Sequence, residues 1–449
     1  MRNSLSERKD IAGRHPLRGE HLRLILICLH ILVCCISLVF VATIYPEYHI
    51  FFRAADLAGA VVIVAAFALV ALLFVFAEFS FGYFIGFFFY TMALGYLWIN
   101  YFSLFDYNHR LTGLSAAASA IVFLLPLLLV RSPVRQIWTL SSDALDRLLS
   151  LILLAAAATI VVGASYNFRF VTVGDIYTYR EALQFPAILN YLTAIMTTAL
   201  LPFAFACLVE RKCFWRAGGA LILLLLFYPV TLTKLALFTP ALLVGMIVLC
   251  RLLEARTAVI MSVLAPMTVG LILFLLYRYE LLHYNVTITY FGLVNFRMIA
   301  IPSMAMDYYN DFFSRHDVTY FCQIRLLKPF VSCPYQEQLA VVIYKAFGIG
   351  GYFNASLFAT EGVASVGPIF APVVAFACGL VIALGNRLSA GLPPRFILLS
   401  GAVLPQAFLN IPLTTVLISH GAALLFLLWY FMPRTMTAPS EAPKPAAAD

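Results

Sequence analysis

The chain has 449 residues, of which 63% are hydrophobic and only 11% are charged, and its mean hydropathy is +0.95. Soluble domains carry about 25% charged residues, so the composition excludes a string of soluble domains and predicts a polytopic membrane protein. The net charge of +8 is also typical of nucleic-acid-binding proteins. Basic cytoplasmic loops account for it here, and we expect no nucleic-acid partner.

The apolar runs are continuous rather than alternating, which favours helices over a β-barrel. We therefore expect an all-α, polytopic transmembrane helical bundle of about 12 spans that contacts the lipid bilayer directly. The expected spans are Leu24–Ile44, Ala54–Phe76, Gly82–Tyr101, Gly113–Val130, Leu148–Ala164, Pro186–Val209, Ala217–Thr231, Leu235–Cys250, Ala258–Leu276, Gly367–Leu384, Phe396–Phe408 and Pro412–Phe431.

The charges between these runs predict the orientation of the chain. A basic N-terminal tail, 1–23, precedes the transmembrane domain 24–434, and an Ala- and Pro-rich tail, 435–449, follows it. Basic residues gather in alternate loops, which places both tails in the cytoplasm under the positive-inside rule. The long polar interval 278–366 then forms one large external loop, in the periplasm of a bacterium. The C-terminal tail has the composition of a disordered segment.

The nine cysteines show no spacing typical of a metal site. Most lie in apolar runs, where cysteine is usually a packing residue. Cys322 and Cys333 fall together in the long external segment, so they are expected to form a disulfide if that segment faces an oxidising compartment. We expect no metal and no cofactor.

Basic and aromatic residues are interleaved in the external loop 166–185. It carries Arg169, Tyr177, Tyr179 and Arg180. Arginine can hold a phosphate group in two-point contact, and tyrosine can stack on sugar rings. The same residues would also suit an ordinary interfacial aromatic belt, and this alternative stays open.

Lys234 stands in the sequence TLTK between two apolar runs with almost no loop between them. Its ammonium group must either extend to the outer membrane surface or point into a polar cavity. The functional alternative is a positive charge placed against a pyrophosphate or a sugar carboxylate. Arg297, at the start of the stretch FRMIAIPSMAMDYYNDFF, is a second candidate for that contact.

Acidic residues in the long segment are candidates for acid–base chemistry. Asp307 and Asp311 lie four residues apart, on one face of a helix, where a solvated helix surface is the alternative. Glu361 lies at the edge of an apolar run, where a carboxylate is costly unless it is paired or used. It is a candidate general base or an ion-pair partner. His316 is a possible base, or a surface residue.

Four stretches together resemble a known family. They are DIYTYR at 175–180, TLTKLALFTPALL at 231–243, Arg297 followed by Pro302 and Tyr308, and NASLFATEGVASVG at 354–367. Their order is similar to that in the bacterial Wzy-type polymerases of lipid-linked repeat units, which are related in architecture to O-antigen ligases. The resemblance covers roughly residues 175–431, with Lys234 where many members have arginine, and without the spaced Arg-to-Gly pattern of some members.

The resemblance implies a GT-C-like, metal-independent glycosyltransferase at the outer face of the bacterial inner membrane. Its substrates would be oligosaccharide repeat units linked to undecaprenyl pyrophosphate, and a polysaccharide chain-length regulator is a possible partner. A flippase or transporter of the same lipids, or an O-antigen ligase, remains an alternative. The roles implied are catalysis by Glu361, Asp307 and Arg297, pyrophosphate binding by Arg180, Lys234, Arg297 and Arg169, and sugar binding by Tyr177, Tyr179, Tyr308, Tyr309 and Asn354.

Overall fold

The computed structural model describes residues 16–172, 174–180, 183–324, 327, 329–349 and 353–434, and for residues 16–18, 177 and 180 only the backbone. Most of the expected tail 1–23 and all of 435–449 lie outside the described residues. Within these ranges the chain is helical, and its extended pairing consists of an isolated bridge between Ile50 and Ser103. This confirms the predicted all-α, polytopic membrane protein.

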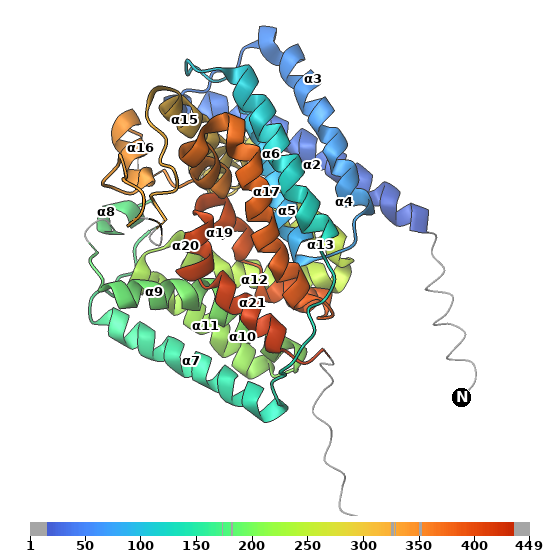
Figure 1. Cartoon of the computed structure of the whole chain (residues 1–449), viewed down its shortest axis with the longest axis vertical. Helices are drawn as coiled ribbons and strands as arrows, with labels where there is room; N and C mark the ends of the chain where they lie inside the picture. The colour runs from blue at the N-terminus through green and yellow to red at the C-terminus, as the bar shows by residue number, and fades with distance from the viewer. Residues whose placement is uncertain are drawn as a thin grey trace, which may run out of the picture.

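The described ranges contain 11 helices that are long and apolar enough to cross a membrane. The first part of the bundle follows the expected order (Figure 1). Its helices are α2 (Pro16–Ile44), α3 and α4 (Leu57–Ala68 and Leu72–Phe76), α5 (Phe81–Ile99), α6 (His109–Leu129), α7 (Ser142–Ala164), the short α8 (Ile176–Arg180), α9 and α10 (Ala187–Ile195 and Leu201–Glu210, joined by the π-helical turn η4, Met196–Leu200), α11 (Phe214–Thr231), α12 (Lys234–Leu252) and α13 (Ala255–Arg278).

The second part of the bundle is more broken. It contains α14 (Tyr284–Leu293), the π-helical turn η5 (Phe296–Ala300), α15 (Ile301–Arg315), α16 (Leu339–Phe347), the π-helical turn η6 (Phe358–Val363), α17 (Ala364–Ser389), α18 (Pro394–Ser400), α19 (Leu404–Asn410), α20 (Leu413–Ile418) and α21 (Ala422–Phe431). Helices α8 and α16 lie on the same side of the molecule (Figure 1).

Ion pairs between helix ends define one end of the bundle, which we call the basic end. They join Arg23 to Glu254 at 3.1 Å, Arg131 to Glu78 at 2.8 Å and Arg211 to Asp146 at 2.8 Å. The opposite end, where α16 and the described residues between 316 and 357 lie, we call the loop end. Since α2 and α13 start together at the basic end, both run toward the loop end.

The interval 278–366, expected as one external loop, is partly built into the bundle. After α13 the chain turns back, and α14 runs down along it. The Tyr290 hydroxyl donates to the Pro266 carbonyl at 3.2 Å, and the Asn295 amide donates to the Met267 carbonyl at 2.8 Å. The interval was expected to be external because polar side chains interrupt its apolar pattern. Inside the bundle those side chains find partners.

Helix α15 then returns to the loop end along α5. The Ser303 hydroxyl donates to the Met92 carbonyl at 3.0 Å, and the Asn310 amide donates to the Tyr96 hydroxyl at 3.1 Å. Although Tyr284–Arg315 is long and apolar enough to cross a membrane, it enters and leaves at the same end. The segment after α15 therefore begins at the same end of the bundle as the segment before α14.

A second such hairpin precedes α17. The Phe358 ring packs 5.2 Å from Phe123, deep in the bundle, whereas the Thr319 N–H of the loop-end segment donates to the Ala364 carbonyl at 2.8 Å. The helix breaks at Gly367, whose φ of 75° and ψ of 170° suit glycine, and α17 then runs down beside α6. Glu361 lies on the ascending arm of this hairpin.

The last two expected spans are each broken in two. Helices α18 and α19 replace the expected Phe396–Phe408 span, and α20 and α21 replace Pro412–Phe431. The breaks fall at residues that disfavour a continuous helix, including Pro412 before α20 and Gly421, at φ 78°, before α21. The chain returns to the basic end, where the Gln136 amide donates to the Met432 carbonyl at 3.0 Å.

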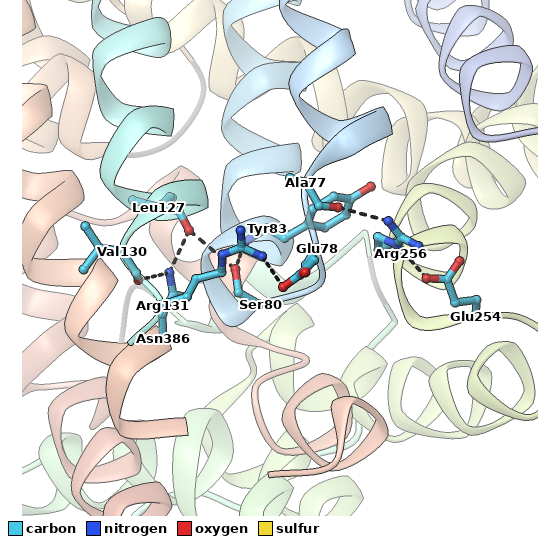
Figure 2. Close-up of polar contacts among 10 residues, drawn as sticks. All are labelled: Ala77, Glu78, Ser80, Tyr83, Leu127, Val130, Arg131, Glu254, Arg256 and Asn386. Atoms are coloured by element: carbon cyan, nitrogen blue, oxygen red, sulfur yellow. Dashed lines mark hydrogen bonds and ion pairs between the residues drawn. The ribbon is translucent and has the colours of Figure 1, made fainter. Parts of the chain in front are cut away.

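One asparagine joins three helices near the basic end. Figure 2 shows its contacts with Leu127 and Val130. The Asn386 amide of α17 donates to the carbonyls of Leu127 at 2.7 Å and Val130 at 3.2 Å, and its oxygen accepts from the N–H of Gly82 at the start of α5. These two carbonyls lie at the C-terminal end of α6, where no following turn of helix supplies N–H donors for them. The contact is close because residue 82 has no side chain.

The structure joins Cys322 and Cys333, the pair singled out in the sequence, by a disulfide at the loop end. The remaining cysteines, seven in number, are free thiols. Such a bond persists in an oxidising compartment, so the loop end is the end expected to face one.

We expect Gly82→Ala to lower the melting temperature of the detergent-solubilised protein. A Cβ atom at this position would lie 2.4 Å from the Leu127 carbonyl oxygen, which would force α5 and α6 apart. Overpacking of this kind costs about 1–3 kcal/mol. The matched control is Gly245→Ala in α12, where no atom lies within 4 Å of the new Cβ. Equal melting temperatures for the two variants would contradict the packing described.

We expect the number of cysteines that react with a maleimide mass tag, before and after reduction, to reveal the disulfide. Denatured but unreduced protein from intact cells should take up seven tags, one for each free cysteine. After reduction it should take up nine, the number of cysteines in the sequence. The readout is the stepwise shift of the band on a gel, and nine tags without reductant would show that the loop end does not meet an oxidising environment.

Candidate functional site

A cavity of about 410 Å³ opens in the half of the bundle nearest the loop end. Its walls come from segments distant in the sequence: α8 and the chain after it, α9 with η4, the turn between α11 and α12, η5, and the breaks on both sides of α20. The lining residues are Ile176, Leu183, Phe185, Asn190, Thr193, Ala194, Thr197, Thr198, Thr231, Thr233, Lys234, Leu235, Arg297, Ile411 and His420. We call it the cationic cavity.

Threonine hydroxyls form one wall of the cationic cavity. Thr193 and Thr197 lie one helical turn apart, and Thr198 follows within η4. The Thr198 hydroxyl is fully buried and has no hydrogen-bond partner in the described protein. Buried hydroxyls normally have a partner, so this one is suited to a bound molecule or water. The π-helical turn is also a feature found often at functional sites.

The turn between α11 and α12 delivers Lys234 to the cavity. Leu232 adopts a left-handed conformation, with φ 48°, and Lys234 is the first residue of α12. The Asn167 amide donates to the carbonyls of Pro229 at 2.8 Å and Val230 at 3.0 Å, which have no helical partner at this helix end. The backbone that carries Lys234 is therefore fixed.

Arg297 reaches the same cavity from η5. The preceding Asn295 is fully buried, and its amide donates to the Ser37 hydroxyl at 2.9 Å as well as to the Met267 carbonyl. A Cβ at Gly270 would lie 1.8 Å from the Asn295 side-chain oxygen, so glycine is required beside it. Asn295 thus anchors the turn from which Arg297 projects.

His420 is the third group in the cavity that can carry positive charge. It lies between α20 and α21, directly before Gly421. A Cβ at Gly421 would lie 3.1 Å from the Cβ of Ala199 in η4. This close approach brings His420 against the wall that holds the threonines.

The charged groups among the described lining residues have one sign. Lys234, Arg297 and His420 line it together with five threonines, and none of the lining residues in the described part of the chain is an aspartate or glutamate. Lys234 and Arg297 also have protein partners. Cations at the wall of a cavity with low-dielectric surroundings attract an anion. The hydroxyls of Thr193, Thr197 and Thr231 already donate to backbone carbonyls, so the Thr198 hydroxyl is the one suited to donate to a bound anion.

The remaining predicted pyrophosphate ligands, Arg169 and Arg180, are not among the described residues that line this cavity. Arg169 is exposed, and its guanidinium carbon lies 5.8 Å from the centre of the Tyr179 ring, a cation–π contact. Helix α8 carries Tyr177 and Arg180 and contributes Ile176 to the lining. The side chains of Tyr177 and Arg180 lie outside the described residues.

Asp307 lies apart from the cavity, in a buried polar cluster at the loop end. It accepts a hydrogen bond from the Tyr107 hydroxyl, and its second oxygen has no partner in the described protein. Burial, and then the Asp307 charge, raises the pKa of the Tyr107 phenol well above its usual value, so the hydroxyl keeps its proton and remains a donor. Asp311 pairs with Arg315, not with a second carboxylate.

Glu361 is buried and lines a second, apolar cavity of about 280 Å³. Its carboxylate accepts from the Thr360 hydroxyl and from the Thr414 backbone N–H, the latter at 3.4 Å. Leu413 and Thr414 line this apolar cavity, while Ile411 lines the cationic one. Leu413 and Thr414 therefore lie between Glu361 and the cationic cavity, and the structure does not bring Glu361 and the cations into one cavity.

The predicted sugar-binding tyrosines have different surroundings. Tyr179 is 42% exposed, whereas Tyr308 and Tyr309 are buried. The Tyr308 ring packs against Phe105 at 4.8 Å and Phe353 at 4.9 Å, so its faces are covered by protein. Asn354 is exposed at the loop end, and His316 stacks on Phe312 at 4.0 Å.

Comparisons with protein-family models, with curated proteins and with solved structures each gave no significant match.

The charge of the cavity can be tested by cysteine modification. In a chain whose seven free cysteines are replaced by alanine, we expect Thr231→Cys to react faster with a negatively charged methanethiosulfonate than with a positively charged one. The local positive potential concentrates anions, and salt should reduce the preference. Adding Lys234→Gln should reduce it too. A preference for the cationic reagent would contradict the assignment.

Proposed function

We propose that this protein is a metal-independent glycosyltransferase that polymerises oligosaccharide repeat units linked to a lipid diphosphate. The observation that carries the proposal is the convergence of Lys234 and Arg297, from different helices, on one hydroxyl-lined cavity. The sequence resemblance to Wzy-type polymerases supports the same reading.

Glycosyl transfer from a lipid diphosphate needs stabilisation of the leaving group. The bond between the sugar C1 and the phosphate oxygen breaks, the electron pair stays on the diphosphate, and a hydroxyl of the acceptor sugar bonds to C1. Two cations and the Thr198 hydroxyl are suited to the diphosphate as its charge grows. We propose Lys234 and Arg297 as its main ligands, with Arg180 and Arg169 at the side of α8 assisting its approach. Tyr179 is the exposed tyrosine there for a sugar ring.

The depth of the cavity favours transfer over translocation. A flippase needs a polar path that reaches both membrane surfaces. The walls of the cationic cavity end in apolar sequence toward the basic end: below Thr198, α10 continues with buried Leu201, Phe203 and Phe205. A transporter is therefore the weaker alternative.

The orientation supports chemistry outside the cytoplasm. The basic end carries the helix-end arginines that pair with Glu254, Glu78 and Asp146, as expected for a cytoplasmic face. The loop end has the Cys322–Cys333 disulfide. We propose that the loop end faces the periplasm of a bacterial inner membrane, with both termini in the cytoplasm, where a chain-length regulator in the same membrane could adjoin it.

We expect Lys234→Gln and Arg297→Gln each to lower polymerisation by about 10²-fold, since each removes a charge that stabilises the departing diphosphate. The assay incubates purified protein with one defined undecaprenyl-pyrophosphate-linked repeat unit and resolves the product ladder by gel. Supplying a lipid A core acceptor in parallel separates a polymerase from an O-antigen ligase, which would give core-linked product and no ladder.

Matched controls are Lys345→Gln and Arg53→Gln. Both residues are at the loop end, with exposed side chains paired to Glu337 and Asp56. Such surface pairs contribute about 0–1 kcal/mol, so these variants should keep the wild-type ladder. The proposal fails if the cavity variants, at equal abundance, make the same ladder as the controls.

A further inference from the structure

We propose that His420 accepts the proton of the acceptor hydroxyl, and that Glu361 acts as a positioning residue that holds His420 through α20. The inference rests on the proposed glycosyl transfer and names the base of that reaction. It departs from the sequence-based expectation, in which Glu361 itself was the candidate base.

The hydrogen bonds of His420 define its tautomer. Its Nδ1 lies 3.4 Å from the Thr415 carbonyl oxygen, and a carbonyl oxygen can only accept. Nδ1 therefore carries the proton in the neutral ring, and Nε2 keeps a lone pair. A histidine held in this way, at the wall of a cavity, is arranged as a proton acceptor for a molecule in that cavity.

The position of His420 in the chain is fixed at both sides. Thr415 accepts from the backbone N–H groups of Ser419 at 2.8 Å and His420 at 3.1 Å, so the end of α20 is tied to the ring. On the other side, Gly421 adopts φ 78° and passes close to Ala199. A residue with a side chain would be strained at this φ, and its Cβ would lie only 3.1 Å from the Cβ of Ala199, so glycine suits the position next to His420.

Glu361 acts on the other end of the same helix. Its carboxylate accepts from the N–H of Thr414, in the first turn of α20, and the Thr360 hydroxyl donates to its second oxygen. Helix α20 comprises only Leu413–Ile418, so it is short enough to move as one rigid unit. We infer that the carboxylate, which anchors the start of this helix, also sets the position of His420 just after its end.

The proposed proton transfer balances with the bond changes of the reaction. The acceptor oxygen bonds to C1, and its proton passes to His420 Nε2. The C1–phosphate bond breaks, and the diphosphate leaves with the electron pair beside Lys234 and Arg297. The imidazolium is then neutralised by loss of its proton to the departing diphosphate or to water.

The structural alternative is that His420 merely caps the last carbonyls of α20. The two roles differ in whether an added small base, imidazole, restores the rate of a variant that lacks the His420 ring. If His420 is the base, His420→Ala should lower kcat by about 10²-fold with little change in KM, and added imidazole should restore part of kcat. A cap would not be restored by imidazole. His316→Ala, a loop histidine stacked on Phe312, is the control and should keep the wild-type rate.

The role of Glu361 is tested by combining variants. Glu361→Ala should lower kcat without abolishing substrate binding, and Glu361→Gln, whose oxygen still accepts from Thr414, should recover most of the rate. If Glu361 acts through His420, the variant carrying both alanines should be no slower than His420→Ala alone. Multiplicative losses, or a Glu361→Ala variant that is as active as wild type, would overturn the positioning role.

Binding separates failure of this inference from failure of the proposed function. The probe is radiolabelled undecaprenyl pyrophosphate, applied to wild-type protein, Lys234→Gln, Arg297→Gln and His420→Ala, each checked for abundance and monodispersity. Loss of binding in the two cation variants, with retained binding but lost rate in His420→Ala, supports both. If His420→Ala keeps the wild-type rate while the two cation variants lose binding, this inference alone is overturned. If the cation variants bind as wild type does, the proposed function is overturned.

Discussion

The structure depends on one constraint: within a membrane, each backbone N–H and C=O group that leaves a helix must find a partner in the protein. The chain meets this constraint with buried amide side chains. Asn167 takes up the carbonyls at the end of α11, Asn295 secures the turn at η5, and Asn386 bridges α5, α6 and α17. Because these breaks are covered, helices can end inside the bundle and leave a cavity between their ends.

The cationic cavity follows from that arrangement. An uninterrupted helix carries its charged residues to the membrane surface, whereas the start of α12 and the turn η5 bring Lys234 and Arg297 below it. A cation is costly in this position unless a partner or ligand compensates for it. Fixed positive charge held in place before an anion arrives needs little rearrangement when it binds, and this is the property that electrostatic catalysis requires.

The class of the protein could be predicted from composition, and most spans from their apolar length. The convergence of Lys234 and Arg297 could not, because it depends on where two helix breaks meet in space. The sequence indicated Glu361 by its unusual position. It did not indicate that Leu413 and Thr414 lie between Glu361 and the cationic cavity.

The threonines and His420 were missed as lining residues. The one-turn spacing of Thr193 and Thr197 was the available signal, but threonine is common in membrane helices. Tyr308 and Tyr309, expected at a sugar, are instead packed in the core.

The two hairpins, Tyr284–Arg315 and the arm before Gly367, have a consequence for biogenesis. Each is apolar, yet each enters and leaves by one end of the bundle, so neither changes which side of the membrane the next segment reaches. The helices that they contact come earlier in the chain: α13 and α5 for the first hairpin, and α6 for the second. Each segment can therefore pack during synthesis against helices that have already been made, from the end at which it enters.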